Sequence, residues 1–240
     1  MAESLPTCTF DDARYCIEQA KTMIERGRFM WRKARESLED AQKMRVSLHG
    51  QIEELAKRGP FRPQFTATLL SGILDAVIEG TAADMGNIQI YDPKTGSLHI
   101  QVHRGFREPF LEFFNSIDPG HAACGAALQS RERVIVPDVS DSTVFSGTHL
   151  LEVMLDAGVR AVQSTPLIGK LGHIWGMLST HYRTLTQPAK KDLRLIDYFA
   201  GWAADILEAE YRAAHSHGSI VATDSNDSQT MAPAPLSSQD

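Results

Sequence analysis

The first residues that could carry chemistry are His121 and Cys124, which lie three positions apart. An imidazole and a thiolate can bind zinc, and the same pair could contact a small ligand or belong to a haem site. A zinc site needs two further ligands, however, and no other Cys or His lies near in the sequence. The alternative is a small buried cysteine beside a surface histidine. We therefore treat the pair as candidate ligand contacts and predict no metal site.

A second set of candidates falls on or beside the last two predicted strands: Arg160, Ser164, Thr165 and His181. Asp138, which follows the strand predicted at 133–136, is a further candidate. Arg160 could pair with an anionic ligand, or it could pair with Asp138 and brace the strand ends. His181 could contact a ligand or act as a hydrogen-bonded structural histidine. No set of nucleophile, base and orienting group can be assembled from local spacing, so no catalytic residue is predicted.

An aromatic cluster precedes both of these sets in the sequence. Residues 107–114 place three phenylalanines within five positions, and on a short helix these side chains cannot all face one core. They are expected to form a lid over a cavity of the domain itself, or else a surface for a partner.

The elements that must position these residues lie between 65 and 214. Alternating polar and apolar residues predict strands, and apolar residues at helical spacing predict helices. The strands are expected at 87–92, 97–103, 133–136, 159–168 and 173–182, and the helices at 65–80, 108–115, 149–157 and 190–214. The order predicts an α+β domain with about six antiparallel strands, whose N- and C-terminal helices can cover one face of the sheet.

The segment before this domain is expected to be helical over 11–58, because small or apolar residues recur at alternating gaps of three and four. A helix with one apolar stripe needs a partner, which is either a second copy in a coiled coil or the rest of its own chain. The two prolines in 59–64 predict a linker. Residues 1–10 and 215–240 are expected to be disordered.

The composition is that of an ordinary globular protein, with 42% hydrophobic and 22% charged residues in a chain of 240. The net charge of −6 argues against non-specific binding to nucleic acid. Three sparse cysteines do not form a disulfide framework and favour a reducing compartment. Neither a secretory signal nor an apolar run long enough for a bilayer is found. These features predict a cytoplasmic protein that does not associate with membranes.

The order of elements and several short motifs together resemble the GAF family, in particular the GAF domains found beside PAS modules and histidine kinases in bacterial two-component signalling. The motifs are 123–128 (ACGAAL), 134–139 (VIVPDV), 157–167 (AGVRAVQSTPL), 172–182 (GHIWGMLSTHY) and 203–208 (AADILE). The resemblance implies a six-stranded antiparallel sheet, helices at the back, and a ligand cavity on the front face. It does not imply a particular ligand.

Three activities of GAF-type domains are not favoured by these residues. Bilin-binding members typically carry His directly after the attachment cysteine, whereas Gly125 follows Cys124 here. Methionine sulfoxide reductases of this fold need several cysteines within the domain for thiol–disulfide exchange, and only Cys124 lies inside it. The Asn-Lys-x-x-Phe-Asp-Glu signature of cyclic-nucleotide sites is absent. The cofactor is therefore unknown, and bilin and haem are not expected.

One departure from the kinase-associated pattern bears on output. Only about 30 residues follow the domain, which leaves no room for a transmitter, and no P-loop or helix-turn-helix region is found. If the chain is complete, it is expected to act on another protein, such as a histidine kinase, or through its own homodimer. If it is a piece of a longer protein, the output is missing from this sequence. The leading hypothesis is a non-enzymatic sensory module that binds a small molecule or a protein. The alternative is a ligand-free adaptor that works through the N-terminal helix.

Overall fold

The structure is a computed structural model that describes residues 18–19, 21–22, 24–25, 63–115 and 121–216. The predictions for 1–10, for most of 11–58, for the linker before Pro63 and for the tail after Ser216 lie outside the described residues. None of the described helices combines the length and apolar character that crossing a bilayer requires.

The centre of the described domain is one antiparallel sheet of five strands in the order β2-β1-β5-β4-β3. The strands are β1 (Met85–Asp92), β2 (Ser97–Arg104), β3 (Val134–Val136), β4 (Ala161–Ile168) and β5 (Ile174–Tyr182). The predicted α+β fold with an antiparallel sheet is confirmed, with five strands in the described ranges where about six were expected. Both predicted hairpins, β1–β2 and β4–β5, are present.

The first hairpin turns where side-chain chemistry favours it. The carboxylate of Asp92 accepts a hydrogen bond from the backbone N–H of Lys94 at 2.8 Å. Gly96 follows with a φ of 75°, a conformation that costs glycine little because it has no Cβ. The hydrogen bond from Lys94 also lowers the pKa of Asp92. This turn fixes the register that aligns β1 with β2.

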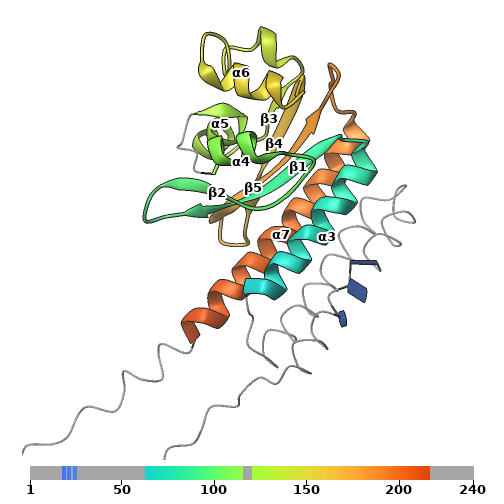
Figure 1. The fold of residues 1–240 in the computed structure, drawn as a ribbon. Coiled ribbons are helices and arrows are strands. Elements are labelled where there is room, and N and C mark those ends of the chain that lie inside the picture. Colours follow the sequence, from blue (N-terminus) through green and yellow to red (C-terminus); the bar gives the residue numbers. More distant parts are fainter. Residues whose placement is uncertain (1–17, 20, 23, 26–62, 116–120, 217–240) are drawn as a thin grey trace, which may run out of the picture.

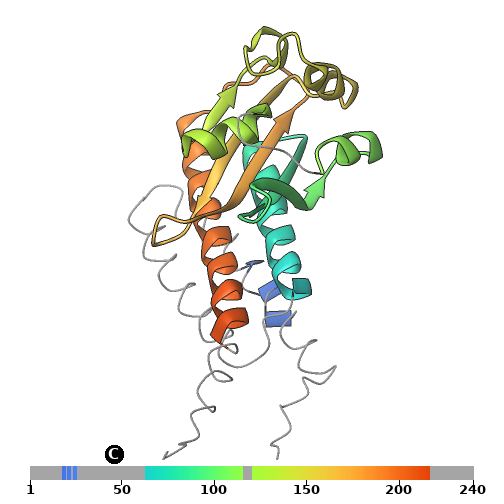
Figure 2. The same ribbon diagram turned by 90° about the vertical axis from the view of Figure 1, so that its left-hand side faces the viewer.

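Two long helices, α3 (Pro63–Thr81) and α7 (Lys190–Ser216), cover one face of the sheet, as predicted. Their apolar side chains pack with Ile88 of β1 and Leu178 of β5 into a buried core. The two helices lie side by side, and α3 begins at the same end of the domain at which α7 ends (Figures 1 and 2). We call this the helix face. A movement of either helix would therefore displace the end of the domain at which α3 begins and α7 ends.

Three short helices and a 3-10 turn lie on the side of the sheet opposite the helix face (Figure 1). They are α4 (Glu108–Phe113), α5 (Ala122–Ser130), η1 (Val139–Asp141) and α6 (His149–Asp156). Their apolar residues pack against the strand side chains on this side of the sheet, and together they form a second buried core. We call this the cavity face. The sheet thus separates two apolar cores.

The N-terminal segment reaches the helix face in the few positions that are described. Residues 24–25 are helical, and Ile24 is 7% exposed and belongs to the core formed by α3 and α7. Gly72 of α3 makes room for it, since a Cβ at that glycine would lie 2.2 Å from Ile24 Cδ1. This contact lies within one chain.

Candidate functional site

The floor of the candidate site is a row of polar side chains on the cavity face of three neighbouring strands. Asn87 of β1 is paired with Ser179 of β5, which is paired in turn with Ser164 of β4. Because alternate strand residues share a face, Gln89 and His181 lie on the same side of the sheet as this row. Each of the five is at most 4% exposed.

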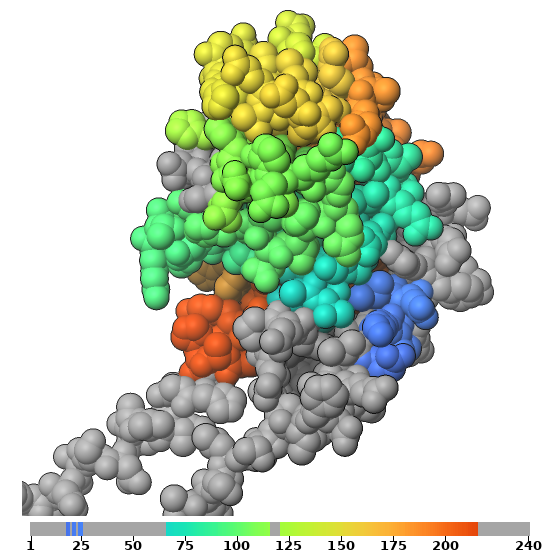
Figure 3. All heavy atoms as spheres, viewed as in Figure 1, coloured from blue at the N-terminus to red at the C-terminus, as the bar shows by residue number. Residues whose placement is uncertain are grey.

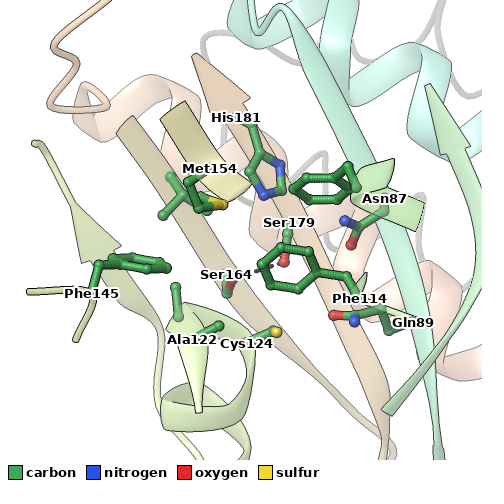
Figure 4. A pocket seen from close by; sticks show the side chains of 13 residues that line it. Asn87, Gln89, Phe114, Ala122, Cys124, Phe145, Met154, Ser164, Ser179 and His181 are labelled. Carbon is green, nitrogen blue, oxygen red and sulfur yellow. Dashed lines mark hydrogen bonds between the residues drawn. The ribbon is translucent and has the colours of Figure 1, made fainter. Parts of the chain in front are cut away.

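The roof of the site is apolar and comes from the segments packed over the sheet. Figure 4 shows these side chains closing the space above the polar floor. They are Phe110 and Phe114 from α4 and the residue after it, Ala122, Ala123 and Cys124 from α5, Phe145 from a loop, and Met154 from α6. Floor and roof together line one cavity.

The cavity is small in this conformation. Its empty volume is about 270 Å³, part of which is open to solvent. The side chains leave room for about one water molecule. In the space-filling view of Figure 3, the segments that carry α4 and α6 form a joined surface over this face. A larger ligand would therefore need the roof to move.

Close approach of β1 and β5 sets the spacing of the floor. Gly176 of β5 pairs with Ile90, and a Cβ at this glycine would lie only 1.9 Å from the backbone oxygen of Gln89. A side chain would push β1 away from β5 at this point. Gly176 therefore permits the register that places Gln89 beside the other floor residues.

The hydrogen bonds of the floor are incomplete. The hydroxyl groups of Ser164 and Ser179 are 2.7 Å apart and bond to each other. By contrast, Asn87 Oδ1, Gln89 Oε1 and His181 Nδ1 are buried and have no hydrogen-bond partner among the described residues. Buried polar groups normally have partners, because an unmade hydrogen bond costs about 1–3 kcal/mol. These three atoms are therefore available to a bound molecule.

His181 is a neutral imidazole at physiological pH. Burial lowers its pKa from 6.5 to about 3, because the charged form would be desolvated. Two aromatic rings hold it edge-on, Phe106 with a centroid distance of 4.9 Å and Phe110 at 5.9 Å. The imidazole can therefore accept or donate a hydrogen bond without carrying charge.

Cys124 is a protonated thiol in the same environment. Burial raises its pKa to about 11, while hydrogen bonds, including one from Gln89, oppose the rise. A thiol with so high a pKa is a poor nucleophile and a poor metal ligand. Among the described residues, no group of three His, Cys, Asp or Glu side chains is placed to hold a metal ion.

Of the seven residues predicted to bind a ligand, the structure brings three into the cavity, namely Cys124, Ser164 and His181. The other four lie elsewhere. His121 is exposed at the start of α5, and Thr165 is on the opposite face of β4, where its hydroxyl accepts a hydrogen bond from Arg133 Nε at 2.8 Å.

The remaining two predicted residues form an ion pair at the strand ends. Arg160 Nη2 lies 3.8 Å from Asp138 Oδ1, and the two side chains are 45% and 29% exposed. Asp138 also caps η1 by accepting a hydrogen bond from the backbone N–H of Ser140. This is the bracing alternative for Arg160, outside the cavity.

Several residues that line the cavity were not predicted from the sequence. Asn87 and Gln89 alternate with apolar residues, a pattern that by itself suggests a face open to solvent. Ser179 lies in the motif at 172–182 but was not among the residues predicted to bind a ligand. The phenylalanines of 107–114 did indicate part of the site. Phe110 and Phe114 both line the cavity, in agreement with the prediction that this segment forms a lid. Phe113 is only partly buried and contacts His149.

Solved structures that resemble the described domain share its fold. One is a domain of a protein described as a two-component sensor histidine kinase from Sinorhizobium meliloti 1021, with 19% identity, a TM-score of 0.52, and coverage of 62% of this chain and 94% of that one. A second is the GAF domain of an Acinetobacter phosphoenolpyruvate-protein phosphotransferase, with 12% identity, a TM-score of 0.52, and coverage of 73% and 98%.

A third similar structure is an enzyme, the free methionine-R-sulfoxide reductase from Neisseria meningitidis, with 18% identity, a TM-score of 0.51, and coverage of 71% and 92%. No curated protein matches the chain. At such identities the structural likeness shows the fold alone. The model of the GAF domain family, however, matches residues 65–208, more than half of the sequence. The chain therefore belongs to the GAF domain family.

Proposed function

We propose that this chain is a sensory module of signal transduction, which binds a small molecule in the cavity and signals through α3 and α7. The observation that carries the proposal is the buried polar floor, whose free hydrogen-bonding atoms add no stability to the ligand-free domain. Polar groups whose hydrogen bonds are unmade in the free protein are expected where a ligand uses these groups for binding.

A connected set of contacts offers a route from the cavity to α7. Ser164 faces the cavity, and its neighbour Thr165 faces the other way. Thr165 accepts a hydrogen bond from Arg133, and Arg133 forms an ion pair with Asp197 of α7. A ligand that shifts β4 would bias the position of α7 if its affinity differs between two arrangements, with a typical coupling of about 1–3 kcal/mol. We call these contacts the β4–α7 link.

The output is proposed to be a protein. Similarity to a domain from a sensor histidine kinase supports a role beside a kinase or another signalling protein. The location in the cytoplasm and the homodimer remain proposals from the sequence. The partner would contact the end of the domain at which α3 begins and α7 ends.

A direct experiment is native mass spectrometry of the full chain purified from its own host, which reports bound small molecules and oligomeric state together. We expect a non-covalent ligand of low mass, and we expect hydrogen exchange in α7 to change when this ligand is removed. The sensory proposal would be contradicted if the purified protein carried no ligand and if no metabolite fraction changed hydrogen exchange in α7.

The second candidate is an adaptor without a ligand. The narrow cavity favours it, as does the contact of Ile24 with the helix face, which ties the N-terminal segment to the domain. The adaptor predicts partner binding that depends on the N-terminal segment and is unaffected by replacement of floor residues. Sulfoxide reduction has less support, because the one cysteine within the matched range is buried and protonated.

A further inference from the structure

The free atoms on the cavity floor define what a ligand must offer. Asn87 Oδ1 and Gln89 Oε1 are hydrogen-bond acceptors, and they come from one strand and face one space (Figure 4). His181 Nδ1, the third free atom, lies on β5 at the next position of the floor. Two neighbouring acceptors call for a ligand with two N–H or O–H donors close together.

The lining also limits the charge of the ligand. The thirteen lining residues include no Asp, Glu, Lys or Arg, and the two that titrate, Cys124 and His181, are held neutral by burial. An anion or a cation in the cavity would lose its hydration and find no opposite charge. The cavity therefore disfavours acids and protonated amines.

The roof limits the rest of the ligand. Phe110 and Phe114 stack on each other with ring centroids 4.4 Å apart, and Phe145 and Met154 lie across from them. These side chains favour an apolar or aromatic body, which would enter as the two stacked rings shift. A suitable molecule thus has a polar edge with donors on one side and an apolar body on the other.

We propose, on the basis of the sensory function above, that the cavity selects a small uncharged primary carboxamide. Its NH₂ group donates to Asn87 Oδ1 and Gln89 Oε1, and its carbonyl oxygen accepts from His181 in the Nδ1–H tautomer. Its apolar body lies against the phenylalanines of the roof. This arrangement gives a partner to each of the three free atoms.

Matched probes test the ligand class on the full chain at neutral pH. Acetamide and benzamide are the probes, and acetate, benzoate and benzylamine are their charged counterparts. We expect titration by calorimetry or ligand-observed NMR to show benzamide binding at least about tenfold more tightly than benzoate or benzylamine. Equal binding of benzoate would overturn the proposal.

Replacement of a floor amide supplies a second test. Asn87→Leu keeps the shape of the side chain and removes its unpartnered oxygen Oδ1. We expect it to weaken benzamide binding about tenfold or more, and to raise the Tm of the ligand-free protein by about 2–4 °C. If this variant does not fold, Gln89→Met makes the same test with a straight side chain of similar length.

Gln163→Leu is the matched control. Its amide lies on the other face of the same sheet, where it donates to the backbone oxygen of Leu178 and accepts from Thr165. This variant should lower the Tm and leave benzamide affinity unchanged. Affinity unchanged by Asn87→Leu and Gln89→Met would overturn the carboxamide proposal.

The failure of this inference can be told apart from that of the proposed function. If no carboxamide binds and native mass spectrometry finds another molecule in the cavity, the ligand class is wrong and the sensor stands. If the cavity binds neither the probes nor any host metabolite, both are wrong.

Discussion

The imidazole of His181 links the burial of the cavity to a measurable pH dependence. Its pKa is about 3 in the folded protein and near 6.5 when unfolded, so between these values the unfolded chain binds more protons. The stability that depends on the neutral ring is fully present above pH 6.5 and is lost as the pH falls toward 3. We expect this group to cost roughly 2 kcal/mol of unfolding free energy between pH 7 and pH 5, measured by urea denaturation.

Other groups titrate in the same range, so the difference between proteins is the useful quantity. His181→Gln replaces the ring with a polar side chain that does not titrate. Its unfolding free energy should fall less steeply below pH 6.5 than that of the wild type. If the two pH profiles are parallel, His181 is not buried as described.

Cys124 gives a second prediction at the level of one residue. With a pKa of about 11 against an ordinary value of 9.0, its thiolate fraction at pH 8 is lower by about 100-fold. In a variant with Cys8→Ser and Cys16→Ser, iodoacetamide should label native Cys124 at least that much more slowly than the urea-unfolded chain. Mass spectrometry measures both rates, and similar rates would mean that the thiol is accessible.

The residues of the site were only partly predictable from the sequence. Ser164 and His181 lie on strands whose alternation is clear, and a face could be assigned to each. Arg160 and Asp138 were chosen because of their charge, yet they form an ion pair at the strand ends, outside the cavity. Asn87 and Gln89 were missed because their burial comes from α4 and α5, which are distant in sequence, and strand alternation carries no information about what covers a face.

At the scale of elements, the approach of β1 to β5 depends on one glycine. Gly176→Ala would place a Cβ 1.9 Å from the backbone oxygen of Gln89, and a backbone atom cannot move aside as a side chain can. We expect a loss of about 3 kcal/mol or more in unfolding free energy, measured by urea denaturation.

Gly80→Ala is the control for this substitution. Its Cβ would meet Leu195 Cδ2 at 2.3 Å, which is the end of a flexible side chain, and alanine favours the helix by about 1 kcal/mol. The net change should be within about 1 kcal/mol. Equal losses in both variants would mean that the strand pairing is not the sensitive feature.

The β4–α7 link gives the second prediction at this scale. Asp197→Asn removes the charge that holds Arg133 to α7, and Asp197 is 59% exposed, so stability should change by less than about 1 kcal/mol. Ligand affinity should persist, while the change in α7 hydrogen exchange on binding should shrink.

The chain contains a matched control for the link. Asp75→Asn breaks a similar ion pair, in which Arg104 Nε lies 2.7 Å from Asp75 Oδ1 and ties β2 to α3. This variant should leave the response of α7 intact. A full response in Asp197→Asn would rule out the link as the route.

Sequence periodicity predicted most of the helices and strands, and there is a physical reason why it did not predict the helix α5. Strong alternation placed both hairpins, and the predicted ends of most elements lie within two residues of those observed. No helix was predicted over the residues of α5. Its residues, AACGAALQS, are small or apolar on nearly all sides and six of them are buried, so they show no amphipathic period.

At the scale of the whole molecule, the sheet separates the cavity from α3 and α7, the helices that are proposed to report its occupancy. The sequence could not decide whether the N-terminal segment packs on its own domain or on a second copy, because one apolar stripe satisfies either partner. The contact of Ile24 with α3 at Gly72 favours packing within one chain.

This contact predicts how stability depends on protein concentration. Ile24→Ala removes a side chain that is 7% exposed, and we expect it to cost about 2–4 kcal/mol. If the contact is made within the chain, the loss should be the same at ~1 µM and ~100 µM, because no association step is involved. Urea denaturation at the two concentrations measures it.

Glu25→Ala serves as the control, because Glu25 is exposed on the same helical turn and its replacement should change stability by less than about 0.5 kcal/mol. An unfolding midpoint that rises with concentration in the wild type, with a smaller effect of Ile24→Ala in the dilute sample, would favour the dimeric coiled coil. In that case Ile24 would act between copies, and ligand occupancy would have to be read as a change in the dimer. A midpoint independent of concentration would leave the helix face of the single chain as the surface through which the cavity signals.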